Sequence, residues 1–586
     1  MKKETPVLLT KISRIVIFIT SIVGLAAIIL EYGFYVSPKE AQLLHYVSIG
    51  VVIIFFVYQS VSFALSKHKK DFVVNHKVET ILISLIVLEL FLSFADFSIV
   101  EQIGLALNIK NIAFLYIVFA QIFLLIGVIG GGLRYNQKIL QIKLHPSRLF
   151  ILSFLITIFV GALLLMLPAS TINHNINFVD ALFTSTSAVC VTGLITVDTA
   201  TYFTTFGQLV IMGLFQIGGL GLMTFTTFFA IFLSGGMGIK ERIVLHDLLD
   251  EENIGAITKV LTYLTLITFI IEFIGAGILY LSVYKNYSDN SEAIFISIFH
   301  SVSAFCNAGF SLFTLNLMDP LVNNNYLFTA TISMLIILGG IGFPTIMSLL
   351  KIKKGLEKSN KFKSVLPIQT SIILKITLLL LVAGTVFTFL LEYNHSLSHL
   401  SLGDKIYTSY FQSVTARTAG FNTIDFAKFT VPTVIFYLLL MFIGASPGGT
   451  GGGLKTTTVA VLWAGTISIL RNEKMAVIGK RAIPKEIILK ALLKMFLSIL
   501  IITIGIFLLT IFENSSLTDI SFESFSAFGT VGLSRGITGT LSDSGKLVIT
   551  LLMFIGRVGP LAFIYSIIKT KEIHSFDLPE ENISIL

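Results

Sequence analysis

The chain of 586 residues is poor in cysteine and in charge. Its two cysteines exclude a disulfide framework and a metal site built from Cys-x-x-Cys pairs. Charged residues make up 13% of the chain, well below the roughly 25% of soluble domains. The net charge of +8 does not require nucleic acid as a partner, because the basic residues cluster in a few loops. This composition therefore excludes a disulfide-rich secreted protein and an ordinary soluble domain.

The chain is instead rich in long apolar runs. Hydrophobic residues account for 54% of the chain, and the mean hydropathy is +0.89. Apolar runs recur at a length that crosses the hydrocarbon core of a membrane as a helix, and we predict about twelve such spans. The first run follows Lys11 and Arg14, lacks a small-residue cleavage site, and is interpreted as a retained span rather than a signal peptide. The predicted fold class is an all-α polytopic membrane protein.

The basic residues alternate from one connection to the next. Residues 66–71, 134–148, 351–363 and 471–481 are rich in lysine and arginine, whereas the intervening connections are poor in both. By the positive-inside rule, the basic loops and both termini are expected to be cytoplasmic. The chain is then a multi-pass protein of the cell (cytoplasmic) membrane, surrounded by lipid.

Four related segments follow one another along the chain. They read FTSTSAVCVTGL (183–194), FHSVSAFCNAGF (299–310), FQSVTARTAGF (411–421) and FESFSAFGTVGL (522–533), and the third is one residue shorter. Their last glycines are separated by 116, 111 and 112 residues. This near-constant period indicates four structural repeats. We expect them at about 148–240, 256–352, 369–472 and 485–586.

The repeats divide the chain into two regions. Residues 148–586 are expected to form a domain of four repeats. Residues 1–147 are expected to form an accessory region of about four extra spans, near 15–32, 45–65, 79–98 and 112–131. None of these early spans carries the regularly spaced arginines of a voltage sensor. We expect a packing, assembly or lipid-facing role for them.

Each repeat is predicted to contain a span, a short apolar segment, a Gly-containing strip and a second span. The short segment cannot cross the membrane, so it must enter and return on one side. It opens near an acid (Asp180, Glu292, Asp404 or Asp519) that suits the positive end of a helix. The same acids are also compatible with ordinary helix N-caps. The negative ends of four such helices would favour a cation where they converge.

The strips that follow carry small side chains. They read CVTG, CNAG, RTAG and GTVG. Such backbone can present carbonyl oxygens that replace the hydration shell of K⁺, and glycine allows the dihedral angles this requires. The predicted K⁺ filter consists of Val191, Thr192, Gly193, Asn307, Ala308, Gly309, Thr418, Ala419, Gly420, Thr530, Val531 and Gly532.

These motifs, with a Gly-rich break in the third repeat, resemble the Trk/Ktr/HKT superfamily of K⁺ transporters, and most closely its KtrB-like and TrkH-like membrane subunits. The resemblance covers about 148–586 and rests on AVCVTGL, NAGF, RTAGFNT and FGTVGL. It implies K⁺ uptake by four span–pore loop–span repeats around a central pore in a homodimer. It also implies a cytosolic RCK-type (KtrA/TrkA-like) regulatory ring. A nucleotide (ATP/ADP or NAD) would bind only to that partner, and no cofactor to this chain.

Two other functions remain open. A Na⁺-permeable or Na⁺/K⁺ co-transporting member of the superfamily is the nearer alternative. A membrane enzyme or pump subunit is the more distant one, because no HExxH, GxSxG or P-loop motif occurs. Glu89, Glu272 and Glu392 are isolated acids within the spans. We therefore predict a transporter and not an enzyme.

The break in the third repeat, GASPGGTGGGLK (444–455), interrupts an apolar span. Irregular backbone at membrane depth needs protein or water to satisfy its polar groups. The resemblance implies that it is an intramembrane loop below the filter, and we expect Arg557 to bond its carbonyls. The predicted gate comprises Gly448, Gly449, Thr450, Gly451, Gly452, Gly453, Lys455 and Arg557. Arg417 is expected to brace the filter through carbonyls or an acid, and Cys190 and Cys306 to pack as small hydrophobes.

Overall fold

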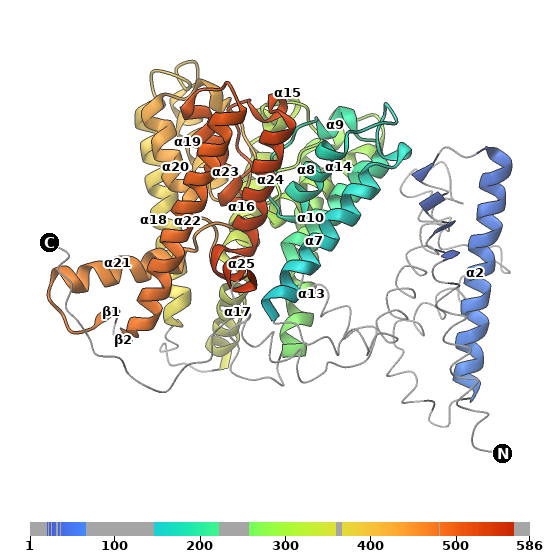
Figure 1. Cartoon of the computed structure of the whole chain (residues 1–586), viewed down its shortest axis with the longest axis horizontal. Coiled ribbons are helices and arrows are strands. Elements are labelled where there is room, and N and C mark those ends of the chain that lie inside the picture. Colours follow the sequence, from blue (N-terminus) through green and yellow to red (C-terminus); the bar gives the residue numbers. More distant parts are fainter. Residues whose placement is uncertain are drawn as a thin grey trace.

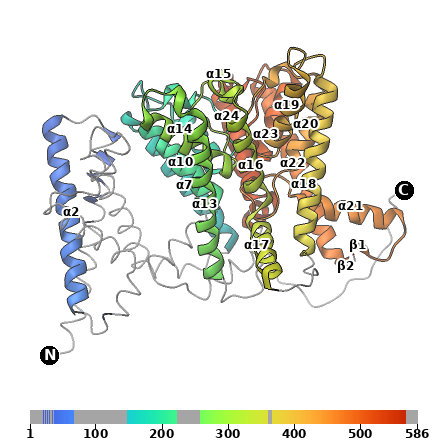
Figure 2. The ribbon, with the colours of Figure 1, turned by 180° about the vertical axis from the view of Figure 1, so that it is seen from behind.

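The computed structural model describes residues 146–221, 257–358, 366–479 and 481–567, together with helix α2 (Pro38–Leu65) and isolated residues between 20 and 69. Helix α2 contains the expected span near 45–65 and stands to one side of the other helices (Figures 1 and 2). The expected spans near 79–98 and 112–131, and most of the span near 15–32, lie outside the described residues.

The same order of elements occurs four times between residues 146 and 567: a first helix, a short helix, a strip without regular secondary structure, and a second helix. The first helices are α7 (Pro146–Leu165), α13 (Ile257–Val283), α18 (Ile368–Glu392) and α22 (Lys485–Phe512). The short helices are α8 (Phe178–Val189), α14 (Asn290–Cys306), α19 (Leu402–Thr415) and α23 (Leu517–Gly529). The second helices are α10 (Thr205–Leu220), α16 (Tyr326–Ile341), α20 (Val431–Phe442) and α24 (Asp543–Val558).

Three of the first helices are long and apolar enough to cross a membrane, namely α13, α18 and α22. A helix of 27 residues is about 40 Å long, which exceeds the roughly 30 Å of hydrocarbon. Large apolar side chains point outward from them, with Phe273 82%, Leu379 66% and Phe507 63% exposed. Apolar faces of this size suit lipid rather than water. The chain is a multi-pass helical membrane protein, as the composition predicts.

The second helices are short because they break. Helices α10, α16 and α24 each contain 16 residues and end at a glycine with positive φ, namely Gly221 (80°), Gly342 (87°) and Gly559 (90°). After the break, α17 (Phe343–Lys358) and α25 (Pro560–Ile567) continue at bends of 95° and 98°. Counting each bent pair as one span raises the crossing helices among the described residues to five. Within the described ranges, these breaks are one reason why fewer uninterrupted spans are found than the apolar runs predict.

In the third unit, the second helix is interrupted by a longer non-helical stretch. Helix α20 ends at Phe442, and the chain resumes as α21 (Thr456–Leu470) after the Gly-rich stretch. Helix α21 lies across the lower end of α22 in Figure 1. A hairpin of β1 (Ala476–Ile478) and β2 (Arg481–Ile483) then leads into α22, with Ala476 opposite Ile483. This two-stranded sheet is the one departure from the predicted all-α fold within the described ranges.

The short helices begin with strong N-terminal signals. In α19 and α23, Ser401 and Ser516 accept a hydrogen bond from the backbone N–H of Asp404 and Asp519, three residues later. Their hydroxyls donate back to those carboxylates, at 2.7 Å in both cases. This reciprocal capping fixes where each helix starts. The predicted acids Asp180 and Glu292 likewise lie in the first turns of α8 and α14.

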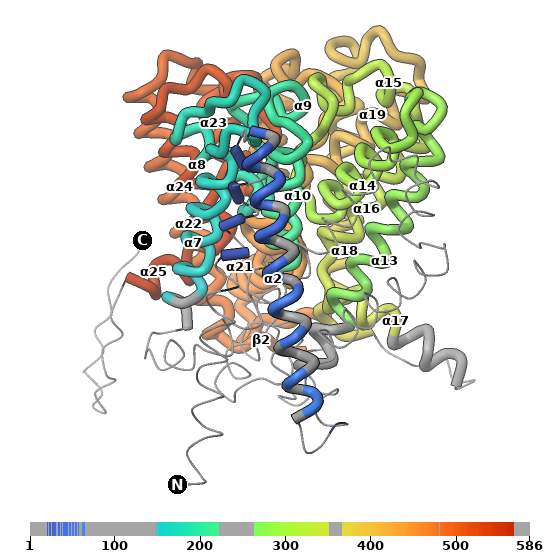
Figure 3. The backbone as a smooth tube through the Cα atoms, turned by 90° about the vertical axis from the view of Figure 1, so that its right-hand side faces the viewer, coloured from blue at the N-terminus to red at the C-terminus, as the bar shows by residue number. Residues whose placement is uncertain are grey.

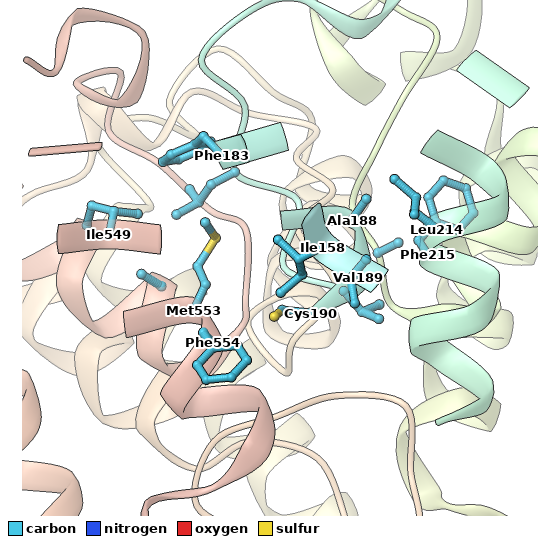
Figure 4. Packing of buried hydrophobic residues seen from close by; sticks show 14 of the residues in the cluster. Ile158, Phe183, Ala188, Val189, Cys190, Leu214, Phe215, Ile549, Met553 and Phe554 are labelled. Carbon is cyan, nitrogen blue, oxygen red and sulfur yellow. The ribbon is translucent and has the colours of Figure 1, made fainter. Parts of the chain in front are cut away.

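The four units close into a ring. Each second helix packs against the short helix of the next unit: α10 on α14, α16 on α19, α20 on α23, and α24 back on α8. Figure 3 shows the first unit (teal) between the fourth (red) and the second (green). Met553 and Phe554 of α24 share a buried cluster with Val189 and Cys190 at the end of α8 (Figure 4). The fourth unit is therefore joined to the first through the core.

Candidate functional site

The four strips share an unusual backbone. When each strip is counted as its three filter residues, the first of the three has a positive φ although it is not glycine: Val191 (57°), Asn307 (59°), Thr418 (69°) and Thr530 (51°). Two residues later each strip reaches its glycine, again at positive φ, between 71° and 91°. Left-handed backbone is a genuine outlier for β-branched residues such as valine and threonine. Strain of this kind persists where the surrounding structure enforces it, which is typical of functional sites.

The strain arises where the short helices end. In three units the chain forms a Schellman turn, in which the second strip residue bonds back five residues: Thr192 N–H to Ser187 O, Ala308 to Ser303 and Val531 to Ser526, at 2.7–2.8 Å. In the third unit, Ala419 N–H instead bonds to Thr415 O, four residues back, at 3.0 Å. The third repeat is one residue shorter in its helix cap, and its strip has the same pattern of positive φ as the other three.

In the first three repeats the S-x-[ST]-A motif anchors the strip from both sides, whereas in the fourth Ser524 Oγ donates to Ile520 O of its own helix and Ser526 Oγ has no hydrogen-bond partner within the described ranges. Its first serine ties the short helix to the first helix of the same unit, as in the bonds from Ser185 Oγ to Ile158 O (2.7 Å) and from Ser301 Oγ to Glu272 O (2.6 Å). Its second hydroxyl binds the backbone at or just after the strip. Ser187 Oγ accepts from Gly193 N–H at 3.0 Å, and Ser303 Oγ donates to Phe310 O at 2.8 Å. These hydroxyls are absent from the predicted site, although the motif that carries them was visible in the sequence.

The four strip glycines form a closed ring. A Cβ added to any one of them would collide with the backbone of the next strip around the ring. The nearest carbonyl oxygens would be Ala308 O from Gly193 (2.5 Å), Ala419 O from Gly309 (2.9 Å), Val531 O from Gly420 (2.9 Å) and Thr192 O from Gly532. The ring therefore has no space for side chains, and each glycine position lies beside a carbonyl oxygen of its neighbour.

The Gly-rich loop (444–455) lies against the strips where they leave the short helices. Gly452 N–H donates to Thr530 Oγ1 at 2.8 Å. Gly451 is so close to Thr418 that a Cβ on this glycine would collide with its hydroxyl. The side-chain amide of Asn307 lies 3.2 Å from Thr418 Oγ1 in the neighbouring strip, and in the orientation that satisfies both amide atoms its oxygen accepts from that hydroxyl. The loop thus contacts the first residues of two strips directly.

The same loop is bonded to the break in α16. Ser446 N–H donates to Gly340 O (3.0 Å) and Thr450 N–H to Gly339 O (3.2 Å). In return, Phe343 N–H donates to Gly448 O at 3.1 Å. Gly449 N–H bonds within the loop to Ser446 O, and both Gly448 and Gly453 have a φ of 69°. The loop N–H groups therefore bind carbonyls that are left unpaired where α16 breaks, and an N–H group after the break binds a loop carbonyl in return.

Two cations bind two further loop carbonyls, those of Thr450 and Gly451. Arg557, in the last turn of α24, donates from Nη1 to Thr450 O and from Nη2 to Gly218 O at the end of α10. Lys455 Nζ donates to Gly451 O at 2.6 Å, and Lys455 is itself the residue from which α21 begins. Arg557 thereby joins the fourth unit to the loop of the third and to the second helix of the first.

Three residues differ from expectation. Arg417 is 7% exposed, and its guanidinium makes no hydrogen bond to a carbonyl or an acid within the described ranges, so the predicted brace through such a bond is wrong. Glu272 is not isolated, because Gln216 Nε2 donates to both of its oxygens at 3.1 and 3.0 Å. Glu392 is not isolated either, because the N–H and the hydroxyl of Thr430 donate to its Oε1 at 2.9 and 2.8 Å. The partners of both acids come from other helices or loops, which the local sequence does not encode.

The sequence reasoning also missed the glycines that precede the helix breaks. Gly218, Gly339 and Gly556 each lie three residues before a break, and a Cβ on them would collide with the carbonyl oxygens of Val189, Phe305 and Phe528, respectively. These carbonyls belong to the carboxyl ends of the short helices. The G-x-x-G spacing, followed by proline at Pro344 and Pro560, is the signal that marks these positions.

A family model for cation transport proteins, TrkH, matches residues 116–576. The chain belongs to this family. The match begins upstream of the boundary expected at residue 148. Because the family consists of transport proteins, the prediction that the chain is a transporter and not an enzyme is confirmed.

Several relatives match over most of their length. The chain is 44% identical over 446 residues to the Ktr system potassium uptake protein B of Bacillus subtilis (strain 168), covering 75% of this chain and 97% of that protein. It is 37% identical to the protein of the same name from Vibrio alginolyticus, covering 72% and 91%. It is 35% identical to the potassium/sodium uptake protein NtpJ of Enterococcus hirae, covering 77% and 99%.

A solved structure shares the fold. The crystal structure of the potassium transporter TrkH from Vibrio parahaemolyticus superposes with a TM-score of 0.60 at 17% identity, covering 84% of this chain and 97% of that one. At this identity the likeness concerns the helical fold alone.

Proposed function

We propose that this protein takes up K⁺ across the cytoplasmic membrane through a selectivity filter made of the four strips. The closed ring of strip glycines carries the proposal. It leaves a path bordered by backbone oxygens from four chain segments, and carbonyl rings of this kind replace the hydration shell of K⁺. The names of the relatives from B. subtilis and V. alginolyticus, both potassium uptake proteins, support the same ion.

The electrostatics of the short helices support a cation at the centre of the ring. All four helices end at the strips, so their negative ends converge there, while the acids lie in their first turns. In this proposal the first turns face the outside. The four units act as span–pore loop–span pseudo-repeats around one central pore, and both termini are cytoplasmic.

The Gly-rich loop is proposed to be the gate. It contacts the strips through Thr418 and Thr530, on the side opposite to the first turns of the short helices. Arg557 keeps it in place through Thr450 O, as a fixed and permanently charged donor. An ion that leaves the strips would meet this loop next, so its displacement would control flux without altering the filter.

Assembly and regulation complete the proposal. The protein works as a homodimer with a cytosolic RCK-type ring, and ATP/ADP or NAD binds to that ring rather than to this chain. The phrase "Ktr system" in the names of two relatives supports a membrane subunit that acts with a partner. No resident cofactor is proposed, and K⁺ is the cargo.

Sodium is the second candidate ion. The E. hirae relative is named a potassium/sodium uptake protein, which favours a Na⁺-permeable or Na⁺/K⁺ co-transporting variant of the same filter. The two candidates differ in one measurable respect, namely whether Na⁺ competes with K⁺ or accelerates its uptake.

The test is Rb⁺ uptake in a bacterial strain that lacks its own K⁺ transport, with K⁺ or Na⁺ as competitor. We expect K⁺ to compete far better than Na⁺ in the unchanged protein. Replacing Gly193, Gly309, Gly420 or Gly532 with serine should lower this preference by about tenfold or more, equivalent to roughly 1.4 kcal/mol. Gly213→Ser is the control, because open space surrounds Gly213 on α10. Unchanged preference in all four ring variants would remove the filter assignment, and Na⁺-stimulated uptake would favour the second candidate.

A further inference from the structure

A cavity of about 200 Å³ lies beside the Gly-rich loop, where the start of α21 meets α22 and α25. Its lining is mixed. Thr457 and Thr458 come from the first turn of α21, and Lys490 and Lys494 come from one face of α22, four residues apart. The remaining lining residues, Val461, Ile487, Ala491 and Leu561, are apolar.

The two lysines of the cavity have no counter-ion. No salt bridge or hydrogen bond is formed by Lys490 or Lys494 within the described ranges, and no acid lines the cavity. Lys490 is exposed, whereas Lys494 is only partly exposed. Holding the ammonium group of Lys494 away from bulk water is unfavourable unless it is paired. The hydroxyls of Thr457 and Thr458 are also without a partner in this part of the chain.

Positive charge continues from the cavity into the loop. The ammonium of Lys455 is close enough to Lys494 and to Arg557 for their charges to repel one another. The amino-terminal end of α21, with Lys455 as its N-cap, adds its own partial positive charge. Two lysines and the start of α21 therefore line a small volume without a carboxylate, and Lys455 lies next to it with its ammonium bonded to Gly451 O.

We propose that this cavity binds a phosphate group. A phosphate offers several acceptor oxygens to the Lys490 and Lys494 ammonium groups and to the two threonine hydroxyls, and charge-assisted bonds of this type are strong. The group can belong to an anionic phospholipid or to a soluble phosphate. The apolar side chains on the same walls suit a lipid, whose glycerol and acyl carbons adjoin its phosphate.

A ligand in this cavity would act on the loop. Helix α21 begins directly after Lys455, which donates to Gly451 O. A phosphate on the first turn of α21 would neutralise the charges around Lys455 and fix the helix start, so it would set how firmly the loop is held. This consequence rests on the proposed function of the loop as a gate, whereas the binding itself does not.

The test measures binding on the purified full-length protein. The double variant Lys490→Gln with Lys494→Gln is compared with the unchanged protein and with Lys485→Gln, an exposed lysine of α22 that does not line the cavity. In one arm, native mass spectrometry counts phosphatidylglycerol retained after exchange into phosphatidylcholine nanodiscs that contain it. In the other arm, inorganic phosphate is titrated and thermal stabilisation is followed. Lys490→Met with Lys494→Met repeats the comparison with side chains that tolerate burial.

Because each lysine near a membrane surface contributes about a fivefold factor, we expect the double variants to weaken binding by roughly ten- to thirtyfold, with Lys485→Gln unchanged. Loss confined to the phosphatidylglycerol arm supports a lipid phosphate, and loss confined to the inorganic phosphate arm supports a soluble one. If all folded variants retain both ligands as the unchanged protein does, or if none of the proteins binds either ligand, the site does not exist. Neither binding measurement depends on K⁺ uptake, so an absence of binding would leave the proposed transport function untouched.

Discussion

At the scale of single residues, strained backbone and hydroxyl anchors occur together. Val191, Asn307, Thr418 and Thr530 all adopt left-handed backbone where glycine would be easier. Their side chains make contacts that glycine lacks: Thr530 Oγ1 accepts from Gly452 N–H, and the side-chain amide of Asn307 lies within hydrogen-bond distance of Thr418 Oγ1. The strain is thus kept at positions whose side chains connect the strips to each other and to the Gly-rich loop.

Replacing Thr530 with valine should loosen the loop. Valine keeps the shape but removes the acceptor of Gly452 N–H, and leaving a buried N–H unpaired costs about 1–3 kcal/mol. We expect faster Rb⁺ uptake with the K⁺/Na⁺ preference nearly unchanged. Thr510→Val, an exposed substitution on α22, serves as the control. Slower uptake, or a changed ion preference at unchanged rate, would contradict the assigned contact between loop and strip.

At the scale of elements, the breaks in the second helices determine the architecture. Glycines before the breaks bring α10, α16 and α24 into contact with the carboxyl ends of the short helices, whose carbonyls leave no space for a Cβ. The backbone at the break in α16 is hydrogen-bonded to the Gly-rich loop. At the end of α24, the side chain of Arg557 is hydrogen-bonded to the same loop. The second helices are therefore supports for the strips as well as spans.

Gly218→Ala should destabilise the protein, because the added methyl group meets Val189 O rather than a side chain that can move. Overpacking of this kind costs about 1–3 kcal/mol. The loss of stability is measured as the temperature at which the purified protein unfolds in detergent, with size-exclusion chromatography as the readout. Gly213→Ala on the same helix meets open space and should unfold at the same temperature or higher. Equal stability of the two variants would show that the close packing of α10 on α8 is unimportant.

Deleting residues 448–453, or replacing Arg557 with alanine, should raise ion flux. The first change removes the part of the loop that contacts Thr418 and Thr530, and the second removes the donor to Thr450 O. The ring of glycines lies outside both changes, so the K⁺/Na⁺ preference should remain similar. Uptake rate and ion preference are measured side by side in the same cells. A normally expressed variant that loses preference at unchanged rate would place the loop in the filter.

At the scale of the whole molecule, the ring is closed by contacts between the fourth and first units. Helix α24 packs on α8, and Arg557 reaches Gly218 O of α10. Each unit supplies one strip, and no unit alone can form the ring of glycines. Residues 1–115 lie outside the matched family range, and 75% of the chain covers 97% of the B. subtilis relative. We therefore propose that the N-terminal region is accessory to this ring.

A chain that lacks residues 1–140 should still take up Rb⁺. We expect the K⁺/Na⁺ preference to be unchanged, because all four strips are retained, while the amount of protein in the membrane falls through lost packing. Uptake is normalised to the amount of protein detected by an epitope tag. A truncated protein that is present at normal levels and elutes as the full-length protein does, yet transports nothing, would assign the N-terminal spans to the conduction path.

The sequence by itself determined the features that depend on local backbone chemistry. Apolar runs indicated a helical membrane protein. The four glycines at near-constant spacing marked the strips, and the Gly-rich stretch marked the break after α20. These features can be predicted because a glycine at positive φ, a hydroxyl in a helix cap and an apolar run of given length are requirements that each segment must satisfy on its own.

Only the tertiary structure decided which of these segments meet. The bond of Arg557 to the loop carbonyl of Thr450 was expected from the family resemblance, but its bond to Gly218 O, 339 residues away in the chain, was not. Arg417, which stands in a strip motif, finds no such partner within the described ranges. The ring of glycines exists because α24 returns to α8, and the cavity with its two unpaired lysines exists because α21 lies across α22. Contacts of this kind depend on how long helices pack around one another, and neighbouring residues in the sequence do not encode that packing.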